Sequence, residues 1–155
     1  MALQKLTDFL DAQDVKYVRI GHSSAYTAQE IAESAHVPGK ELAKTVMILV
    51  ENTMAMAVLP ATHHMDVFLL RDNIGAEEVS LAREEEFQNL FPDCELGAMP
   101  PFGNLYGVPV YVCNSLAEEE HIAFNAGSHR ELVQLKYSDF ARLVSPIVAN
   151  FSTKT

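Results

Sequence analysis

The sequence is poor in several features that define large classes of protein. Only two cysteines occur, Cys94 and Cys113, and they lack the spacing of a disulfide framework or a zinc site, so we interpret both as reduced thiols. No apolar run approaches the ~18 residues of a membrane span, which argues against a membrane partner. The first residues carry an acid early and lack the apolar core of a signal peptide, from which we expect a cytoplasmic protein.

Basic residues are scarce as well. The chain has 11 lysines and arginines against 21 aspartates and glutamates, which gives a net charge of −10. This balance argues against DNA as a partner and against broad, non-specific RNA binding, and it confines any RNA contact to a short basic patch. The 155 residues suit one domain spanning residues 1–155, with enough length for a hydrophobic core.

Familiar catalytic motifs are also missing. No glycine-rich phosphate loop opens a helix, and Ser128 lacks the flanking pattern of a nucleophile elbow, so we interpret it as a binding residue. Cys94 has no recognisable base nearby in the sequence and is interpreted as an idle thiol. His63 and His64 are adjacent, so on a strand they point to opposite faces, which argues against a metal. A metal-dependent hydrolase that uses these histidines and His22 stays open as an alternative, but no cofactor or metal is expected.

What the sequence does contain is an interleaved series of helical and strand patterns. The apolar run that follows Thr45 is apolar on both faces, which predicts a central strand covered on each side. Ser138 is predicted to cap the last helix, and the tail from Asn150 is predicted to fray. The order of elements predicts an α/β fold of the mixed α+β kind, with a mixed, largely antiparallel sheet and helices packed on its faces. The helices are expected at 3–13, 27–35, 65–73, 84–90 and 139–144, and the strands at 16–20, 41–50, 54–59, 78–82, 106–113, 121–126 and 131–135.

Two features of this pattern are candidates for function. The stretch Gly97–Gly103 has two prolines at its centre, which fix φ and remove two N–H donors, between glycines that permit unusual backbone angles. It is therefore predicted to be a loop of one shape whose remaining N–H groups could face a ligand, although a rigid crossover explains it at least as well. Lys44 begins the apolar strand, and taken alone it is better explained as a solvated strand-end lysine.

Four stretches taken together resemble the YbaK family, the editing domain associated with prolyl-tRNA synthetases and its free-standing relatives. They are His22 with Tyr26–Glu30, then Glu41–Val46, then Gly97–Gly103, and then Asn125–Glu131. The resemblance runs from about residue 15 to about residue 145, and no synthetase body accompanies it. It therefore implies a free-standing member with the fold of that family.

The resemblance also implies an activity. The family hydrolyses the ester between a wrong amino acid and the terminal adenosine of a tRNA, often the tRNA for proline. The family's lysine falls on Lys44, which would orient the substrate, and its Gly-x-x-x-Pro loop falls on Gly97–Pro101. Catalysis would need N–H donors where the oxyanion forms, and Gly97, Ala98 and Met99 would supply them. Water activated by the ribose hydroxyl of the substrate would make a protein base unnecessary.

The resemblance further implies how the substrate is held. A pocket around Met47, Ala98 and Met99 would accept alanine, cysteine or serine. Only the acceptor end of the tRNA would be touched, with Lys40, Arg71 or Arg130 as neighbours of Lys44. The substrate-binding residues implied in this way are His22, Tyr26, Thr45, Met47, Met99, Pro100, Pro101, Gly127, Ser128 and His129.

An alternative of a different class is also open. A non-catalytic member of the same family would bind aminoacyl-adenosine-like ligands or a synthetase partner. The presence of Lys44 and of an intact Gly97 loop favours the enzyme.

Overall fold

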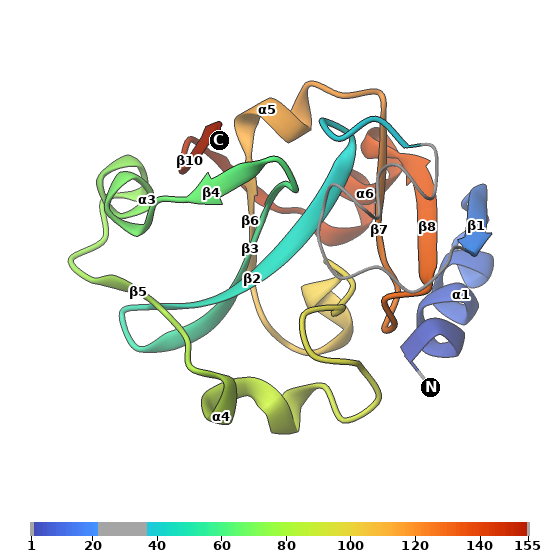
Figure 1. Cartoon of the computed structure of the whole chain (residues 1–155), viewed down its shortest axis with the longest axis horizontal. Helices are drawn as coiled ribbons and strands as arrows, with labels where there is room; N and C mark the ends of the chain where they lie inside the picture. Colours follow the sequence, from blue (N-terminus) through green and yellow to red (C-terminus); the bar gives the residue numbers. More distant parts are fainter. Residues whose placement is uncertain (1, 22–36, 155) are drawn as a thin grey trace.

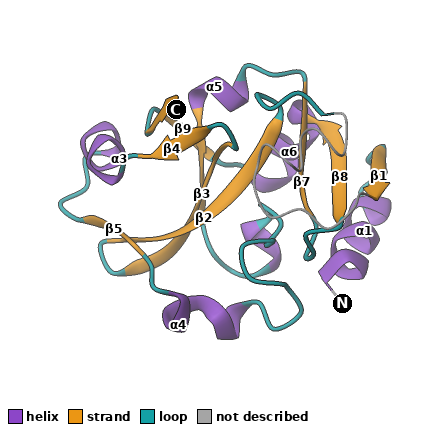
Figure 2. Ribbon diagram, in the orientation of Figure 1, coloured by secondary structure: helices purple, strands orange, loops and turns teal. Residues whose placement is uncertain are grey.

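The computed structural model describes residues 2–21 and 37–154. His22, Tyr26 and the predicted helix at 27–35 lie outside this part of the chain. The described helices and strands follow the predicted order closely (Figure 2). Helical segments occur where 3–13 and 84–90 were predicted, and strands occur where 41–50, 54–59 and 121–126 were predicted. Their bounds are α1 (Ala2–Ala12), β1 (Tyr17–Gly21), β2 (Leu42–Val50), β3 (Thr53–Pro60), β4 (His63–Met65), α3 (Val67–Ile74), β5 (Val79–Leu81), α4 (Glu84–Phe87), η1 (Gln88–Leu90), η2 (Gly103–Leu105), β6 (Val110–Cys113), α5 (Asn114–Ala117), β7 (His121–Asn125), β8 (Glu131–Lys136), α6 (Tyr137–Val144), β9 (Ile147–Ala149) and β10 (Ser152–Lys154).

The fold is built on a mixed sheet, as predicted, and its strand order is β1-β8-β7-β2-β3-β6-β9 (Figure 1). The β1–β8, β8–β7 and β2–β3 pairs are antiparallel, whereas β2–β7, β3–β6 and β6–β9 are parallel. A further strand, β5, pairs antiparallel with β2 off this path, and β4 and β10 form a separate two-stranded sheet. No described helix is both long enough and apolar enough to cross a membrane.

The longest strand, β2, has two different partners along one edge. Strand β3 pairs with its other edge over the whole length from Ala43 to Val50. On the first edge, β7 pairs only at Leu42 and Ala43, and β5 pairs only from Ile48 to Val50. Within the described chain, residues 44–47 therefore have no strand beside them on this edge. We call this stretch the β2 gap.

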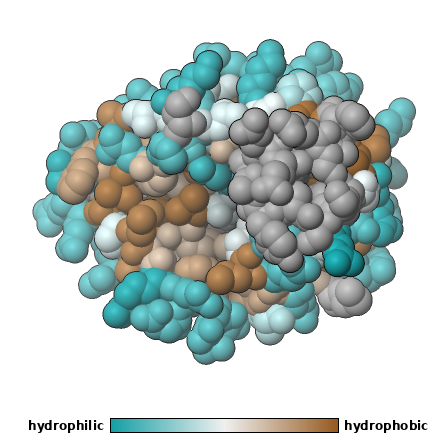
Figure 3. Space-filling view, viewed as in Figure 1, coloured by the Kyte–Doolittle hydropathy of each residue, from teal (hydrophilic) through white to brown (hydrophobic). Residues whose placement is uncertain are grey.

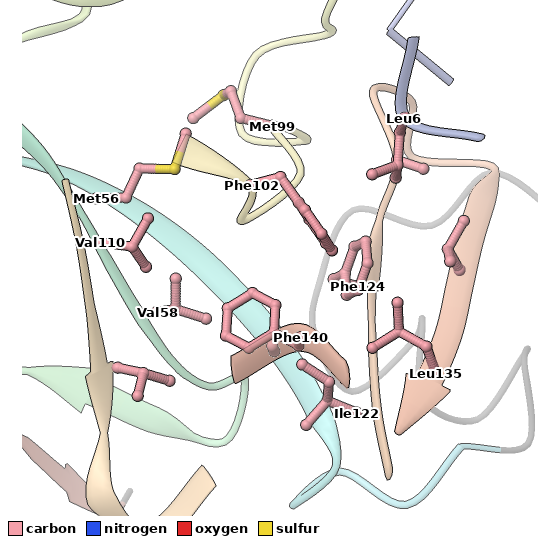
Figure 4. Packing of buried hydrophobic residues seen from close by; sticks show 14 of the residues in the cluster. Leu6, Met56, Val58, Met99, Phe102, Val110, Ile122, Phe124, Leu135 and Phe140 are labelled. Carbon is pink, nitrogen blue, oxygen red and sulfur yellow. The ribbon is translucent and has the colours of Figure 1, made fainter. Parts of the chain in front are cut away.

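Hydrophobic clusters cover both faces of the sheet, which confirms that β2 is a central strand. Met47 belongs to the main cluster, and the next residue, Ile48, belongs to a second cluster on the opposite face together with Leu70 of α3 and Phe151. Phe102 lies in the middle of the main cluster and is fully buried (Figure 4). Its ring centroid lies 5.5 Å from that of Phe124, and also 5.5 Å from that of Phe140.

Some predictions about element ends were wrong. The tail does not fray from Asn150, because Phe151 is buried and residues 152–154 pair with β4 as strand β10. Ser138 does not cap α6: the N-cap is Lys136, and no side chain caps this end. The predicted strand over 106–113 begins only at Val110, after a 3-10 turn. The helix expected from Met65 begins at Val67, where the Asp66 carboxylate accepts hydrogen bonds from the N–H groups of Phe68 and Leu69.

Candidate functional site

An open, mostly apolar cavity of about 340 Å³ lies at the β2 gap. It falls within the size range of small-ligand sites, which starts at roughly 300 Å³. The space-filling view shows brown, hydrophobic side chains across the middle of this face, with a hydrophilic rim over α4 below them (Figure 3). The cavity is lined by Thr45, Val46, Met47, Leu81, Ala82, Glu84, Phe87, Leu96, Gly97 and Met99. The structure thus brings together four of the predicted site residues from two distant stretches of sequence.

The β2 gap also exposes backbone polar groups to this cavity. The carbonyl of Met47 accepts a hydrogen bond from the N–H of Ala82, so the peptide groups of Met47 face the edge that carries the gap. Along a strand, residues two apart direct their N–H and C=O groups to the same edge. The N–H and C=O of Thr45 therefore face the gap, where no described strand pairs with them.

The proline loop forms one wall of the cavity and has a fixed shape. Gly97 is exposed and has φ +81°, a left-handed conformation that favours glycine. Residues 98–102 are buried, and Phe102 anchors this segment in the main core. The N–H of Ala98 donates to the carbonyl of Glu95 at 3.0 Å, so the prediction that this N–H is free for a ligand was wrong. Among the described residues, no backbone acceptor takes a hydrogen bond from the N–H of Gly97 or Met99.

Three hydrogen bonds fasten this loop to the turn between β7 and β8. The N–H of Gly127 donates to the carbonyl of Ala98 at 2.8 Å, and the carbonyl of Gly127 accepts from the N–H of Glu95 at 2.8 Å. The Nε2 atom of His129 lies 2.8 Å from the carbonyl oxygen of Leu96. The structure therefore places residues 127–129, which the resemblance implied to bind substrate, directly against the proline loop.

Lys44 is not among the residues that line the cavity. Its side chain is half-buried, on the face of β2 opposite Thr45, and its Nζ donates to the carbonyl of His63 at 2.5 Å. Burial lowers the pKa of Lys44. An ammonium group carries three N–H donors, and among the described residues only the carbonyl of His63 takes one of them, which leaves two for a ligand.

Other predicted residues lie elsewhere. Gly127 and Ser128 line a separate cavity of about 200 Å³ beside α1, and the Ser128 hydroxyl accepts a hydrogen bond from the N–H of Arg130 at 3.0 Å. Pro100 and Pro101 are buried in the loop and support its shape. Of the basic neighbours proposed for Lys44, Lys40 lies 4.0 Å from a carboxylate oxygen of Glu119.

The sequence patterns missed Val46, beside Thr45 in β2, and five further residues of the cavity lining. Leu81, Ala82, Glu84, Phe87 and Leu96 come from β5, α4 and the segments beside them. Their elements were predicted, but only the antiparallel pairing of β5 with β2 brings them to Met47. Glu84 is the one ionisable residue in the described lining, so the other lining residues carry no charge.

The candidates for covalent or metal chemistry can also be placed. Cys94 is half-buried, and burial is the main cause that raises the pKa of its thiol, so the thiol is protonated at neutral pH. His63 and His64 lie on the short strand β4, with His63 half-buried and His64 exposed. In residues 2–21 and 37–154, no group of three or more His, Cys, Asp or Glu side chains could hold a metal. His22 lies outside those residues.

Residues 22–143 match the family model described as the aminoacyl-tRNA editing domain. The chain is 28% identical over 153 residues to a multifunctional Ser/Thr-tRNA deacylase, ProXp-y, of Escherichia coli strain K12, an alignment that covers 96% of this chain and 91% of that protein. It is 27% identical over 124 residues to a proline–tRNA ligase of Staphylococcus epidermidis, covering 74% of this chain and 22% of the ligase. A crystal structure described as that of a proposed trans-editing enzyme for prolyl tRNA synthetase has the same fold, with a TM-score of 0.82 at 19% identity, covering 98% of this chain and 97% of the other.

Proposed function

The chain belongs to the aminoacyl-tRNA editing domain family and is an aminoacyl-tRNA deacylase, and we propose that it acts in trans on tRNA mischarged with a small amino acid. The proposed amino acids are alanine, cysteine and serine, and the proposed carrier is the tRNA for proline. Serine is the first to test, because the Escherichia coli relative is named for seryl- and threonyl-tRNA.

The observation that carries this proposal is the cavity at the β2 gap. It brings Thr45 and Met47 opposite Gly97 and Met99, and its apolar lining suits a small, uncharged side chain. Its volume exceeds what such a side chain needs, which leaves room for part of the terminal adenosine. The peptide groups of Thr45 in the gap would hydrogen-bond this part of the substrate.

The proposed reaction is hydrolysis of the ester bond. Water, activated by the ribose hydroxyl of the substrate, adds to the ester carbonyl and gives a tetrahedral oxyanion. The N–H groups of Gly97 and Met99 stabilise this oxyanion, since the N–H of Ala98 is bonded to Glu95. The carbon–oxygen bond to the ribose then breaks, the ribose oxygen takes the proton that the water gave up, and the free amino acid leaves.

Lys44 has a different proposed role. The two N–H donors of Lys44 that no described residue takes would hold the terminal phosphate or ribose, which orients the ester. Contact is limited to the acceptor end, because a chain with net charge −10 repels the rest of the tRNA.

The test is deacylation of a panel of tRNAs charged with alanine, cysteine, serine and threonine. Wild-type protein should hydrolyse at least one of them, and Lys44→Ala should lower kcat/KM by a large factor. Lys16→Ala is the control, because Lys16 is an exposed lysine between α1 and β1, outside the cavity lining, and its loss should leave activity unchanged. Equal hydrolysis by wild type and Lys44→Ala would reject the role of Lys44. If wild type binds the tRNAs but hydrolyses none, the chain is the non-catalytic binding module instead.

A further inference from the structure

A chain of hydrogen bonds runs from β6 to Lys44. The Sγ atom of Cys113, at the end of β6, lies 2.9 Å from the Oγ atom of Ser152 in β10. The same Oγ atom lies 2.8 Å from Nδ1 of His63 in β4. The carbonyl of His63 in turn accepts the hydrogen bond from Lys44. Ser152 is thus the link between a buried thiol and the residue that holds Lys44.

The surroundings of His63 determine the charge of its ring. Burial is the main cause that lowers the pKa of His63, and the charges of Lys154 and Lys44 lower it further. The imidazole is therefore neutral at neutral pH, and a neutral ring has one acceptor nitrogen. The Ser152 hydroxyl can bond to either tautomer of this ring: it donates to Nδ1 when the ring N–H is on Nε2, and its oxygen accepts from Nδ1–H in the other tautomer.

Strand β4 depends on β10 for its position. It has three residues, and its register partners are Ser152, Thr153 and Lys154 in β10. An isolated two-stranded pair is marginally stable in water, so additional contacts must hold it in place. The buried Phe151 ring and the bond from the Asp66 N–H to the Phe151 carbonyl, 2.8 Å long, fix the start of β10. The Ser152 hydroxyl adds the side-chain link that fixes His63 itself.

We propose that Ser152 is a positioning residue for the deacylase: its hydroxyl, held by Cys113, fixes His63 and so the carbonyl that orients the Lys44 ammonium. This inference rests on the proposed role of Lys44. The side chain of Ser152 does not touch the substrate. It acts by restricting where the two remaining N–H donors of Lys44 point, and a poorly oriented ester reacts more slowly even when it is bound.

The experiment is a double-mutant cycle on single-turnover deacylation of the best mischarged tRNA from the panel. Ser152→Ala should lower kcat by about fivefold, the equivalent of ~1 kcal/mol for one hydrogen bond, with KM little changed. In the Lys44→Ala background the same substitution should have no further effect, because the group that it positions is gone. Ser152→Thr keeps the hydroxyl on a strand and should restore most of the activity.

Two further variants separate positioning from general stability. Thr153→Ala is the matched control, since Thr153 is the next residue of β10, is exposed and pairs with His64. It should leave kcat unchanged. Cys113→Ala removes the other end of the chain of hydrogen bonds and should lower kcat less than Ser152→Ala does. Thermal melts of all variants check that the fold is kept.

The outcomes are distinct. If Ser152→Ala lowers kcat by a similar factor with and without Lys44, or does not lower it at all, the positioning role is overturned while the role of Lys44 stays intact. No loss from Lys44→Ala overturns both. The inference is supported if Ser152→Ala lowers kcat about fivefold only when Lys44 is present, and if Ser152→Thr keeps most of the wild-type kcat.

Discussion

Replacing Gly97 with alanine tests whether the backbone of the proline loop takes part in catalysis. Gly97 has φ +81°, and a left-handed conformation costs a residue with a Cβ roughly 1–2 kcal/mol. The added Cβ would lie 3.7 Å from Cε1 of His129, an ordinary contact that adds no clash. We therefore expect Gly97→Ala to lose about 1–2 kcal/mol of unfolding free energy, from backbone strain alone.

The expected loss of activity is larger than this loss of stability. The loop can relieve the strain only by rotating the Gly97 peptide, which turns its N–H away from the oxyanion. Loss of one such donor typically costs ~3–4 kcal/mol of transition-state stabilisation. Single-turnover deacylation should therefore show kcat lowered by about 10²-fold or more with KM little changed, since the donor acts only in the transition state.

Gly107→Ala is the matched control for the backbone strain. Gly107 has φ +72°, an added Cβ there would have open space around it, and the residue lies outside the cavity lining. Denaturant titration should show a similar loss of unfolding free energy for both variants, whereas only Gly97→Ala should lose activity. Wild-type activity in Gly97→Ala, or equal losses of activity in the two variants, would refute the oxyanion role of the loop.

Three more predictions concern the rest of the site. The logarithm of kcat/KM at subsaturating tRNA should fall with the logarithm of salt concentration, at a slope of about −0.7 for each phosphate contacted. A total slope steeper than about −4 would indicate an extended RNA interface and contradict contact with the acceptor end alone. Cys94→Ala and Ser128→Ala should each keep most of the wild-type kcat, because the Cys94 thiol is protonated and Ser128 lines another cavity; a 10²-fold loss in either would point to a protein nucleophile. Because burial lowers the pKa of Lys44 below 10.5, kcat/KM should fall as the pH rises through that pKa, and Lys44→Arg should move the fall to higher pH. Between the lowered pKa of Lys44 in the folded chain and 10.5, the unfolded chain binds more protons, so the free energy of unfolding should rise with pH while activity falls. If the fall in kcat/KM occurs at the same pH in Lys44→Arg as in wild type, Lys44 is not its cause.

Local patterns were enough to predict most of the helices and strands. The two-sided apolar run after Thr45 correctly predicted a central strand, and the helix predicted to end at residue 73 ends one residue later, at Ile74, with Gly75 in a left-handed conformation. The C-terminal strands were missed because β9 and β10 have three residues each, too short for any periodicity to show. Only their pairing with β6 and β4 makes them strands.

The site was harder to predict than the fold. The proline loop could be identified because prolines and glycines act on the backbone directly. The resemblance implied that Gly127 binds the substrate, but not that its N–H is bonded to the carbonyl of Ala98. The bond that occupies the Ala98 N–H depends on how the preceding turn closes onto Glu95, which the sequence does not encode in any short motif. The wall formed by Leu81 and Phe87 depends on sheet register, a long-range property.

The burial of Phe102 has a consequence for hydrogen exchange. Because this ring packs between Phe124 and Phe140, the loop that begins at Gly97 belongs to the same cooperative unit as the centre of the domain. The bonded amide of Ala98 should therefore exchange with solvent as slowly as amides of β2 and β3, through global opening rather than local fraying. Ordering of the loop then takes place once, when the chain folds, and is not repeated at each encounter with a tRNA.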